Sequence, residues 1–380
     1  MGRLFRLRTI VFSNNSFGGG IPNNLSRCSK LEWLNLVDNN LTGNIPAELG
    51  TLSRLRTSIL GEIARLRRLK FVLLSINNLS GKVPSGLYNI STIISLSVAV
   101  NQLEGNILPD IGSTLPNLKD LYIVGNLFTG TLPTSLSNAS ELESIDFSEN
   151  NFSGTMPRDL GKLLGLRYLE VIQVGDNLFR GSLPDSIANL STYLSVIIFP
   201  INQIHGIIPS GIGNLLNLTD LSMATNNLAG PIPSSIGRLH KLQSLLLDQN
   251  KFTELPSSLG NLTSLITLNL GENNIHGSIP PSLGNCHSLL ELVLYKNNFN
   301  GSLPTEIMSL SSISTFLLLD HNALSGSLPS QVGLHGEVPI QGVFQNGSAI
   351  SVVGNNDLCG GIAKLGLPLV YPLNQATTSY

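Results

Sequence analysis

Acidic and tyrosine side chains recur at regular places along this 380-residue chain, each beside a short apolar stretch. Rows of carboxylates and phenol hydroxyls recognise basic or hydroxyl-rich groups, so they favour binding, for example of a peptide, over bond-breaking chemistry. A second interpretation treats each aspartate as an ordinary polar residue of a repeated pattern. The candidate binding residues are Asp120, Tyr122, Asp146, Glu149, Asp176, Asp220, Ser222, Asp248, Glu272, Glu291, Tyr295, Lys296 and Asp320.

Catalytic and metal-binding patterns do not stand out from this background. The glycine run at residues 18–20 belongs to a turn, and no phosphate-binding helix follows it. His205, His276 and His335 share one place in the pattern, but they are 71 and 59 residues apart, too far for one metal site. Ser, His and Asp all occur at repeated positions, so no triad is favoured. We therefore expect no catalytic residue, no metal and no cofactor.

The elements that position the candidate residues follow a fixed frame of about 24 residues. Residues 218–233 read Leu-Thr-Asp-Leu-Ser-Met-Ala-Thr-Asn-Asn-Leu-Ala-Gly-Pro-Ile-Pro, and the same frame returns from residue 31 and from residue 289. It is the signature of a leucine-rich-repeat solenoid, whose coils are stable only when stacked. Thirteen repeats are marked by one asparagine each: Asn15, Asn39, Asn77, Asn101, Asn126, Asn150, Asn177, Asn202, Asn226, Asn250, Asn273, Asn297 and Asn322.

Each fixed position of the frame has a structural role. Leu221 and Met223 alternate with polar residues, which predicts a short strand with one buried face. Asn226 ends the strand, where its amide can bond the backbone of the neighbouring coil. Gly230 permits a turn that a Cβ would hinder, and Pro233 then fixes φ. The predicted fold class is an α/β repeat: a right-handed leucine-rich-repeat solenoid with a parallel sheet on the concave face and irregular or 3-10 segments on the convex face.

The repeat length changes sharply at two places. Asn77 follows Asn39 by 38 residues, ten short of two repeats, and the repeat after Pro329 lacks its leucine strand. We interpret these steps as internal deletions near residues 58–61 and 330–334, which would leave the adjoining coils without a matched apolar face. The expected domains are a solenoid over residues 1–339 and a remnant C-terminal cap with a disordered tail over residues 340–380.

Composition favours a secreted protein with a weakly charged surface. Charged residues make up 12% of the chain, and the formal net charge is −2. This balance disfavours nucleic acid as a partner, and the basic cluster at residues 65–70 is interleaved with leucines, as on a solvated convex face. The chain has no apolar run of about 20 residues, so we expect no transmembrane segment. Its first residues already follow the repeat frame, so we expect no signal peptide.

The half-repeat L-x-G-x-I-P resembles the plant-type leucine-rich repeat of plasma-membrane receptor-like kinases. The tail at residues 336–346 and 353–361 is similar to the end of the ectodomain in the subfamily that includes receptors for bacterial elicitors. This resemblance implies a module on the extracellular side of the plasma membrane that binds a peptide or microbial pattern and engages a leucine-rich-repeat co-receptor kinase. In the family a membrane span and a Ser/Thr kinase follow. The sequence holds no kinase motif, so the chain is expected not to be an enzyme.

Cysteines and glycosylation sequons fit a repeat protein of the secretory route. Cys28 and Cys286 occupy equivalent repeat positions and are expected to be buried. Cys359 matches the first cysteine of the family's C-terminal cap without its usual partner, which predicts a free thiol or an intermolecular bond. The N-x-S/T sequences predict glycosylation or are accidents of the repeat consensus. The candidates are Asn24, Asn89, Asn138, Asn189, Asn217, Asn261 and Asn346.

Two alternative functions stay open at the level of the sequence. A secreted, kinase-less repeat protein, such as a hydrolase inhibitor or a decoy, is one alternative. A non-functional truncated fragment is the other alternative. It is favoured by an open first coil that would expose Leu4, Leu7, Ile10 and Phe12, because the terminal coils of solenoids need polar caps.

Overall fold

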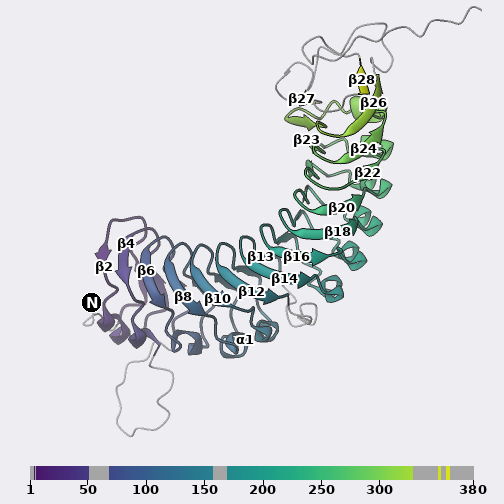
Figure 1. Ribbon diagram of the computed structural model, residues 1–380. Coiled ribbons are helices and arrows are strands. Elements are labelled where there is room, and N and C mark those ends of the chain that lie inside the picture. The colour runs from purple at the N-terminus through teal and green to yellow at the C-terminus, as the bar shows by residue number, and fades with distance from the viewer. Residues whose placement is uncertain are drawn as a thin grey trace, which may run out of the picture. The chain divides into compact units, whose positions relative to one another are not determined.

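The computed structural model describes residues 4, 6–50, 68–156, 169–327, 350–351 and 357–359. They fall into two compact units, unit 1 (Met1–Asn227) and unit 2 (Leu228–Tyr380). In each unit a typical coil gives one short strand to a main sheet, one strand to a second sheet and one turn of helix (Figure 1). The fold is the predicted leucine-rich-repeat solenoid, with parallel sheets and 3-10 turns.

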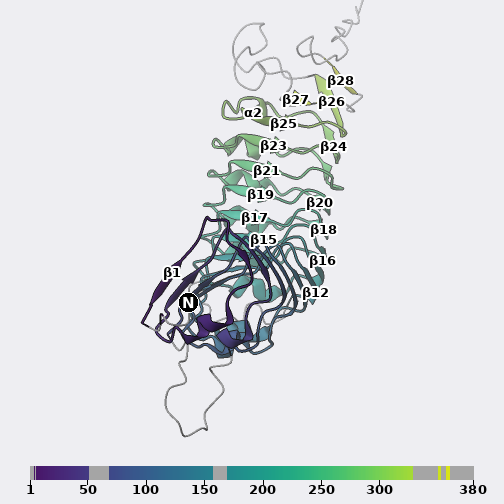
Figure 2. The same cartoon turned by 90° about the vertical axis from the view of Figure 1, so that its left-hand side faces the viewer.

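The main sheet of unit 1 is parallel, and its strands pair in chain order. Pairing in register places Thr9 beside Trp33 and Trp33 beside Phe71, so equivalent side chains form columns across the sheet. The first strand, β1, lies at the edge of this sheet (Figure 2). The strands are β1 (Thr9–Val11), β3 (Trp33–Asn35), β5 (Phe71–Leu73), β7 (Ser95–Ser97), β9 (Asp120–Tyr122), β11 (Ser144–Asp146), β13 (Val171–Gln173), β15 (Val196–Ile198) and β17 (Asp220–Ser222).

The main sheet of unit 2 is built in the same way. Its strands are again parallel, and Thr267 lies beside Ser244 and Glu291 in the register. The strands are β19 (Ser244–Leu246), β21 (Thr267–Asn269), β23 (Glu291–Val293), β25 (Phe316–Leu318) and β27 (Ile350–Ser351).

A second run of parallel strands follows each bend of the coil. In unit 1 these strands are β2 (Gly18–Gly19), β4 (Asn40–Gly43), β6 (Asn78–Lys82), β8 (Gln102–Asn106), β10 (Leu127–Gly130), β12 (Asn151–Thr155), β14 (Leu178–Ser182) and β16 (Gln203–Gly206). β18 (Asn227–Pro231) begins at the last residue of unit 1, and the strands of unit 2 are β20 (Lys251–Glu254), β22 (His276–Gly277), β24 (Asn298–Gly301), β26 (Ala323–Ser327) and β28 (Asp357–Cys359). Gly230, where the sequence predicts a turn that a Cβ would hinder, has a positive φ of 76°. Where Glu254 replaces that glycine in the next coil, the register between β18 and β20 shifts.

Short helical turns line the outer side of each unit (Figure 1). Most begin after a proline of the frame, as at Pro133, Pro209 and Pro233, because proline fixes φ near the value that a helix start requires. The turns of unit 1 are η1 (Asn23–Arg27), η2 (Ala47–Leu49), η4 (Leu87–Asn89), α1 (Ile111–Thr114), η5 (Thr134–Asn138), η7 (Asp185–Asn189) and η8 (Ser210–Asn214). Those of unit 2 are η9 (Ser234–Arg238), η10 (Ser257–Asn261), η11 (Pro281–Asn285) and α2 (Thr305–Met308).

The core is a stack of equivalent apolar side chains from successive coils. Leu221 and Met223 are buried as predicted, with exposures of 0% and 1%. Phe128, Phe152 and Phe179 stack within unit 1, with ring centroids 6.3 Å apart at each step. Because Phe152 stacks on a phenylalanine on each side, removing its ring would leave two neighbours with lost contacts.

The marker asparagines, which we call the ladder asparagines, join neighbouring coils. The side-chain amide of Asn177 donates to the backbone oxygens of Val174 and Gly175 in its own coil and of Phe147 in the preceding coil. Its Oδ1 accepts the backbone N–H of Phe152, also in the preceding coil. Asn177 is 6% exposed, so its amide satisfies backbone groups that water does not reach. The predicted bond between coils is confirmed.

The irregular steps do not interrupt the sheets. β3 pairs directly with β5 across the 38-residue step, and β4 pairs with β6. The expectation that these coils lack a matched face is therefore wrong for the described residues. The proposed deletions near residues 58–61 and 330–334 lie outside the described part of the chain. Both sheets of unit 2 continue past residue 339, because β27 pairs with β25 and β28 pairs with β26.

Candidate ligand-binding surface

Three candidate residues of unit 1 lie together on the face of the main sheet. Asp120 and Tyr122 begin and end β9, and Asp146 ends β11. The register places Asp146 beside Tyr122 and Ser144 beside Asp120. All three candidates are half-buried between neighbouring side chains, so they are held in place while one side of each meets solvent.

This part of unit 1 is strongly acidic. Residues 119–149 hold five carboxylates (Asp120, Glu141, Glu143, Asp146 and Glu149) and one lysine, Lys119, which gives 1 − 5 = −4. The ammonium of Lys119 bonds the Glu143 carboxylate, which raises the pKa of Lys119. Burial raises the pKa of Asp120, although a hydrogen bond with Ser95 opposes the effect. The Oδ1 of Asp146 accepts the Ser148 N–H at 2.9 Å, which fixes its side chain.

Asp220 and Ser222 on β17 have different environments. Asp220 is half-buried and accepts a hydrogen bond from the Thr219 hydroxyl at 2.7 Å. Ser222 is only 4% exposed, so the expectation that it faces a ligand is wrong. It lies beside Ile198 of β15, and its short side chain does not reach past such a larger neighbour.

Four predicted residues occupy a turn and not a strand. Glu149, Asp176, Glu272 and Lys296 each directly precede a ladder asparagine and have positive φ values of 53°, 49°, 54° and 49°. A left-handed residue bends the chain out of the strand, so these side chains stand at the rim of the sheet. The alternation rule placed them on the strand face, which is incorrect.

The same left-handed position carries apolar residues that the sequence pattern did not single out. Ile76, Val100 and Ile201 have φ values of 56°, 51° and 51° and are 48%, 51% and 50% exposed. Counting back one residue from each ladder asparagine would have found them. Phe71 was also missed, and it stacks on Trp33 with ring centroids 4.2 Å apart.

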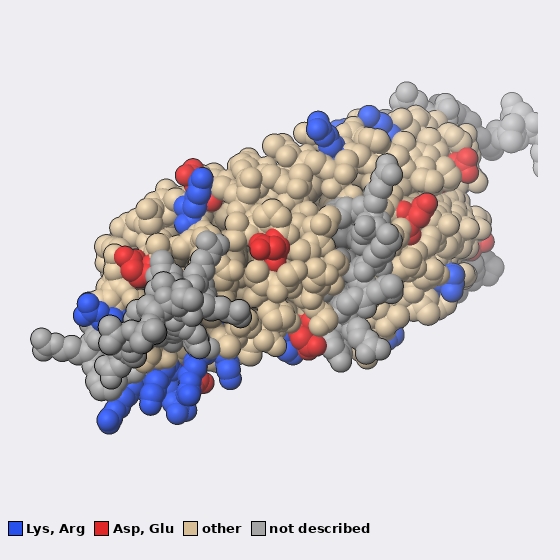
Figure 3. Space-filling view, turned by 90° about the horizontal axis from the view of Figure 1, so that it is seen from below, with Lys and Arg blue, Asp and Glu red and all other residues tan. Residues whose placement is uncertain are grey.

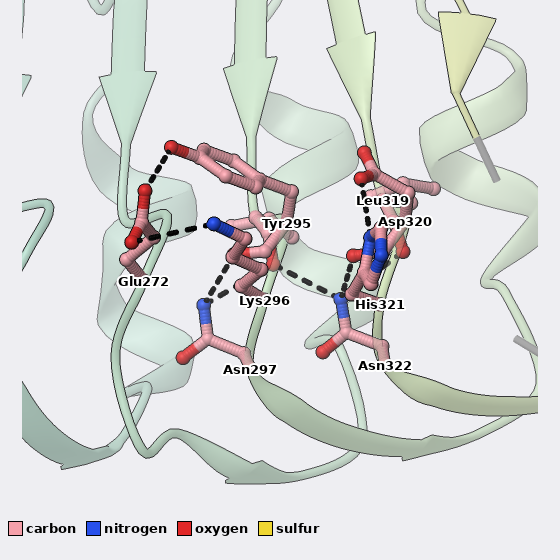
Figure 4. A network of polar contacts seen from close by, with 9 residues as sticks. Glu272, Tyr295, Lys296, Asn297, Leu319, Asp320, His321 and Asn322 are labelled. Atoms are coloured by element: carbon pink, nitrogen blue, oxygen red, sulfur yellow. Dashed lines mark hydrogen bonds and ion pairs between the residues drawn. The ribbon is translucent and has the colours of Figure 1, made fainter. Parts of the chain in front are cut away.

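The candidates of unit 2 form a tighter cluster around Tyr295 (Figure 4). The Tyr295 hydroxyl donates to Glu272 Oε1 at 2.7 Å, and Lys296 Nζ lies 3.5 Å from Glu272 Oε2. The ring lies over Gly271, where a Cβ would come within 2.3 Å of Tyr295 Cε1. A glycine at this place therefore permits the ring to reach Glu272.

The hydrogen bond between Tyr295 and Glu272 shifts the pKa values of the two residues in opposite directions. It raises the pKa of Tyr295 to about 12, and it lowers the pKa of Glu272. Burial raises the pKa of Asp248, and the negative charge of Glu272 adds to that effect. The cluster thus joins one aromatic ring, a lysine and several carboxylates at the rim of the unit 2 sheet.

Two further candidates complete the surface of unit 2. Asp320 follows β25, and its Oδ2 lies 2.8 Å from Nδ1 of His321, a residue that the sequence pattern did not select (Figure 4). Glu291 begins β23 and is half-buried, and the Thr267 hydroxyl approaches its Oε2 at 3.4 Å.

The remaining predicted sites lie on other surfaces. Cys28 and Cys286 are buried thiols, as expected, and burial raises the pKa of Cys286 to about 11. Asn24, Asn138, Asn189 and Asn261 are exposed and lie in helical turns, whereas Asn89 and Asn217 are half-buried. Asn346 lies outside the described residues, and the side chain of Cys359 is not described.

The face viewed from below is weakly charged (Figure 3). Lys and Arg side chains gather at the end where the first coils of unit 1 lie, and elsewhere charged groups are scattered. Arg68 and Lys70 of the basic cluster are exposed on either side of the buried Leu69, whereas Arg65 and Arg67 are outside the described residues.

The described residues hold no group of three or more His, Cys, Asp or Glu side chains arranged to bind a metal ion. Among the helices described, none has the length and apolarity needed to cross a membrane.

Comparison with known proteins identifies the repeat. The family model for a leucine-rich repeat region matches residues 198–314, and the model for a single Leucine Rich Repeat matches residues 6–28, 30–52, 117–139 and 141–163. The LRR receptor-like serine/threonine-protein kinase EFR of Arabidopsis thaliana is 45% identical over 64 residues, which cover 17% of this chain and 6% of that kinase. Matched segments cover between 5% and 7% of the curated relatives' length.

Solved structures match nearly the whole chain. The crystal structure of a TDR receptor aligns with a TM-score of 0.80 and 30% identity, and the match covers 97% of this chain and 59% of that one. The Arabidopsis receptor kinase HAESA, in complex with the peptide hormone IDA and the co-receptor SERK1, aligns with a TM-score of 0.63 and 26% identity. That match covers 95% of this chain and 63% of the HAESA chain.

The stacked strands, the ladder asparagines and the family models define a leucine-rich-repeat protein. Within that family, the chain is similar in sequence to plant leucine-rich-repeat receptor kinases and in structure to receptor chains such as the TDR receptor and HAESA.

Proposed function

We propose that this chain is the extracellular ligand-recognition part of a plant receptor-like kinase at the plasma membrane. It binds a peptide or a microbial pattern on the sheet face of its coils and passes the signal through a leucine-rich-repeat co-receptor kinase. The observation that carries this function is the division of each coil into a buried, repeated frame and an outward column that varies. Asp120, Tyr122 and Asp146 show this division, because they are held by the sheet while one side stays open.

The comparisons support a peptide ligand and a co-receptor. HAESA was solved with the peptide hormone IDA and the co-receptor SERK1, and another neighbour, RGFR1, was solved with RGF2. The acidic sheet face of unit 1 and the Tyr295 cluster of unit 2 provide groups that would hold a basic or hydroxyl-rich peptide. The solenoid is proposed to span residues 1–339 and to be followed by a C-terminal cap, whose strands β27 and β28 continue the sheets of unit 2.

Selection from a library of random peptides, displayed on phage and presented to the full chain, tests this function. We expect enriched peptides with a basic residue, whose binding is reduced at least about tenfold when Asp146, Asp220 and Asp248 are all replaced by lysine, a loss of roughly 1.4 kcal/mol or more. Asp185→Lys, on the helical turn η7, is the matched control for an added positive charge. Failure to enrich any peptide, or enriched binding that the triple variant leaves unchanged, would contradict the proposal.

A further inference from the structure

The sheet face of unit 1 presents three patches in a row. The first patch is apolar and lies over β3 and β5, and the second is acidic and lies over β9 and β11. The third lies over β13 and β15 and is apolar apart from Gln173. Since neighbouring strands pair in chain order, the order of patches along unit 1 is fixed by the fold.

Trp33 and Phe71 form the centre of the first patch. The two residues are register partners, and their stacked rings lie on the sheet face, where Trp33 is 36% exposed. In the next column Val11, the register partner of Asn35, is 54% exposed. A contiguous exposed apolar group of this kind marks a binding surface more than a scattered residue does.

A second reason comes from the rim of the sheet beside this patch, where Ile76 follows β5 and Val100 follows β7. Ile76 and Val100 are β-branched residues with φ values of 56° and 51°, a conformation that such residues rarely adopt. All the described equivalent positions are left-handed, and most hold polar residues or glycine, among them Asn14 and Asp38, which tolerate this conformation better. An exposed apolar side chain kept in a strained conformation indicates a role in contacts outside the fold.

The second and third patches have distinct chemistry. Asp120 and Asp146 lie on adjacent strands, and the nearby Lys119 is already bonded to Glu143. Beyond them Val171, Val196 and Ile198 occupy the sheet face, and Ile201 repeats the strained, exposed arrangement of Ile76. An excess of carboxylates between two apolar patches is complementary to a basic group flanked by apolar ones.

The distances between patches set the spacing that a ligand must have. Three strand steps separate the centres of the first and second patches, and two steps separate the second and third. At about 4.8 Å per step these are roughly 14 Å and 10 Å, or about four and three residues of extended chain at about 3.3 Å each.

We infer that unit 1 recognises an extended peptide that crosses its strands and carries an apolar residue, a basic residue about four places on, and a second apolar residue about three places beyond. The order is given from β3 towards β15. This specificity rests on the proposed function and defines the class of its ligand. A linear row of patches suits an extended peptide better than the broad face of a folded partner.

Trp33 makes the test direct, because it is the single tryptophan of the chain and its emission reports on the first patch. The probe is a capped octapeptide with leucine first, arginine fifth and leucine eighth, and glycine and serine elsewhere. It is titrated together with its reversed sequence up to millimolar concentration, because the sheet does not fix the peptide's direction. One of the two is expected to give a saturable change in emission. A peptide with glutamate in place of arginine should bind at least about tenfold more weakly.

Three variants of the full chain link the binding to the patches. Asp146→Asn should weaken binding of the octapeptide about tenfold, whereas Asp185→Asn on η7 removes the same charge away from the sheet and should have no effect. Ile76→Gly should weaken binding severalfold while raising the thermal midpoint. Asp38→Gly is the control, because it makes the same change to glycine at the equivalent left-handed position of the preceding coil.

The inference is overturned if neither octapeptide binds, if the glutamate peptide binds equally well, or if both Asp146→Asn and Ile76→Gly leave binding unchanged. The peptide library separates this failure from that of the proposed function. Enriched peptides with another order of residues would leave peptide recognition standing and remove only the inferred pattern. Without any enriched peptide, both proposals fall.

Discussion

A single asparagine at each ladder position serves two coils at once. Asn297 donates to Leu294 and Tyr295 in its own coil and to Leu270 in the preceding coil, and it accepts the N–H of Ile275. The bonds to Leu294, Leu270 and Ile275 are buried and the bond to Tyr295 is partly buried, so water does not readily replace the buried ones.

Asn297→Ala should therefore lower the free energy of unfolding by about 3 kcal/mol, since buried polar groups left without partners cost about 1–3 kcal/mol each. Asn298→Ala, one residue further on at an exposed position, should change it by less than about 0.5 kcal/mol. Urea unfolding followed by circular dichroism measures both. Equal losses in the two variants would show that the ladder does not carry this stability.

The bond between Tyr295 and Glu272 predicts a pH window. The pKa of Glu272 is lowered from 4.5, so the bond's contribution is present above about 4.5 and is lost as pH falls through the folded pKa. The pKa of Tyr295 is raised from 10.0 to about 12, so the contribution is present below 10.0 and is lost as pH rises through about 12.

A double-mutant cycle with Tyr295→Phe and Glu272→Gln should show its greatest coupling between about pH 5 and pH 10. Unfolding midpoints at pH 3, 7 and 11.5 supply the measurement. A coupling that is flat across this range would rule out the charged hydrogen bond as its source.

At the scale of elements, the helical turns pack so closely that glycine is required. A Cβ on Gly112 of α1 would lie 1.8 Å from the backbone oxygen of Ser135 in η5. Gly112→Ala should therefore destabilise the chain by about 1–3 kcal/mol through overpacking. Gly18→Ala is the matched control, because its nearest atom, the Asn40 oxygen, would be at 3.7 Å. Thermal unfolding compares them, and similar midpoints would contradict the close packing.

The elements also show how far sequence reasoning reaches. The frame predicts the strand, the bend and the core, because Leu221, Met223 and Asn226 have tasks that depend only on their own coil and its neighbours. It does not predict which outward residue is buried. Ser222 is covered because its neighbours are larger, and Glu272 and Lys296 leave the strand because the residue before each ladder asparagine is left-handed. Those outcomes depend on packing across coils and on backbone conformation, which alternation alone does not encode.

For the whole molecule, the glycosylation sequons give the clearest prediction. The exposed Asn24 and Asn261 lie on helical turns away from the main-sheet strands, so a glycan there leaves the sheet free. When the chain is expressed in plant cells behind a secretion signal, we expect enzymatic deglycosylation to lower its mass. Asn24→Gln and Asn261→Gln should each remove one glycan. If deglycosylation left the mass of the secreted chain unchanged, these sequons would be accidents of the repeat consensus and would carry no glycan.

The ladder has a direction. From Asn39 onwards, the described asparagine of each coil completes the hydrogen bonds of the coil before it, as Asn177 does for Phe147 and Phe152. A nascent chain emerging from the ribosome therefore holds its newest coil incomplete until the next asparagine arrives. Each later coil closes the one already made, so the fold is suited to assembly from its N-terminal end during synthesis.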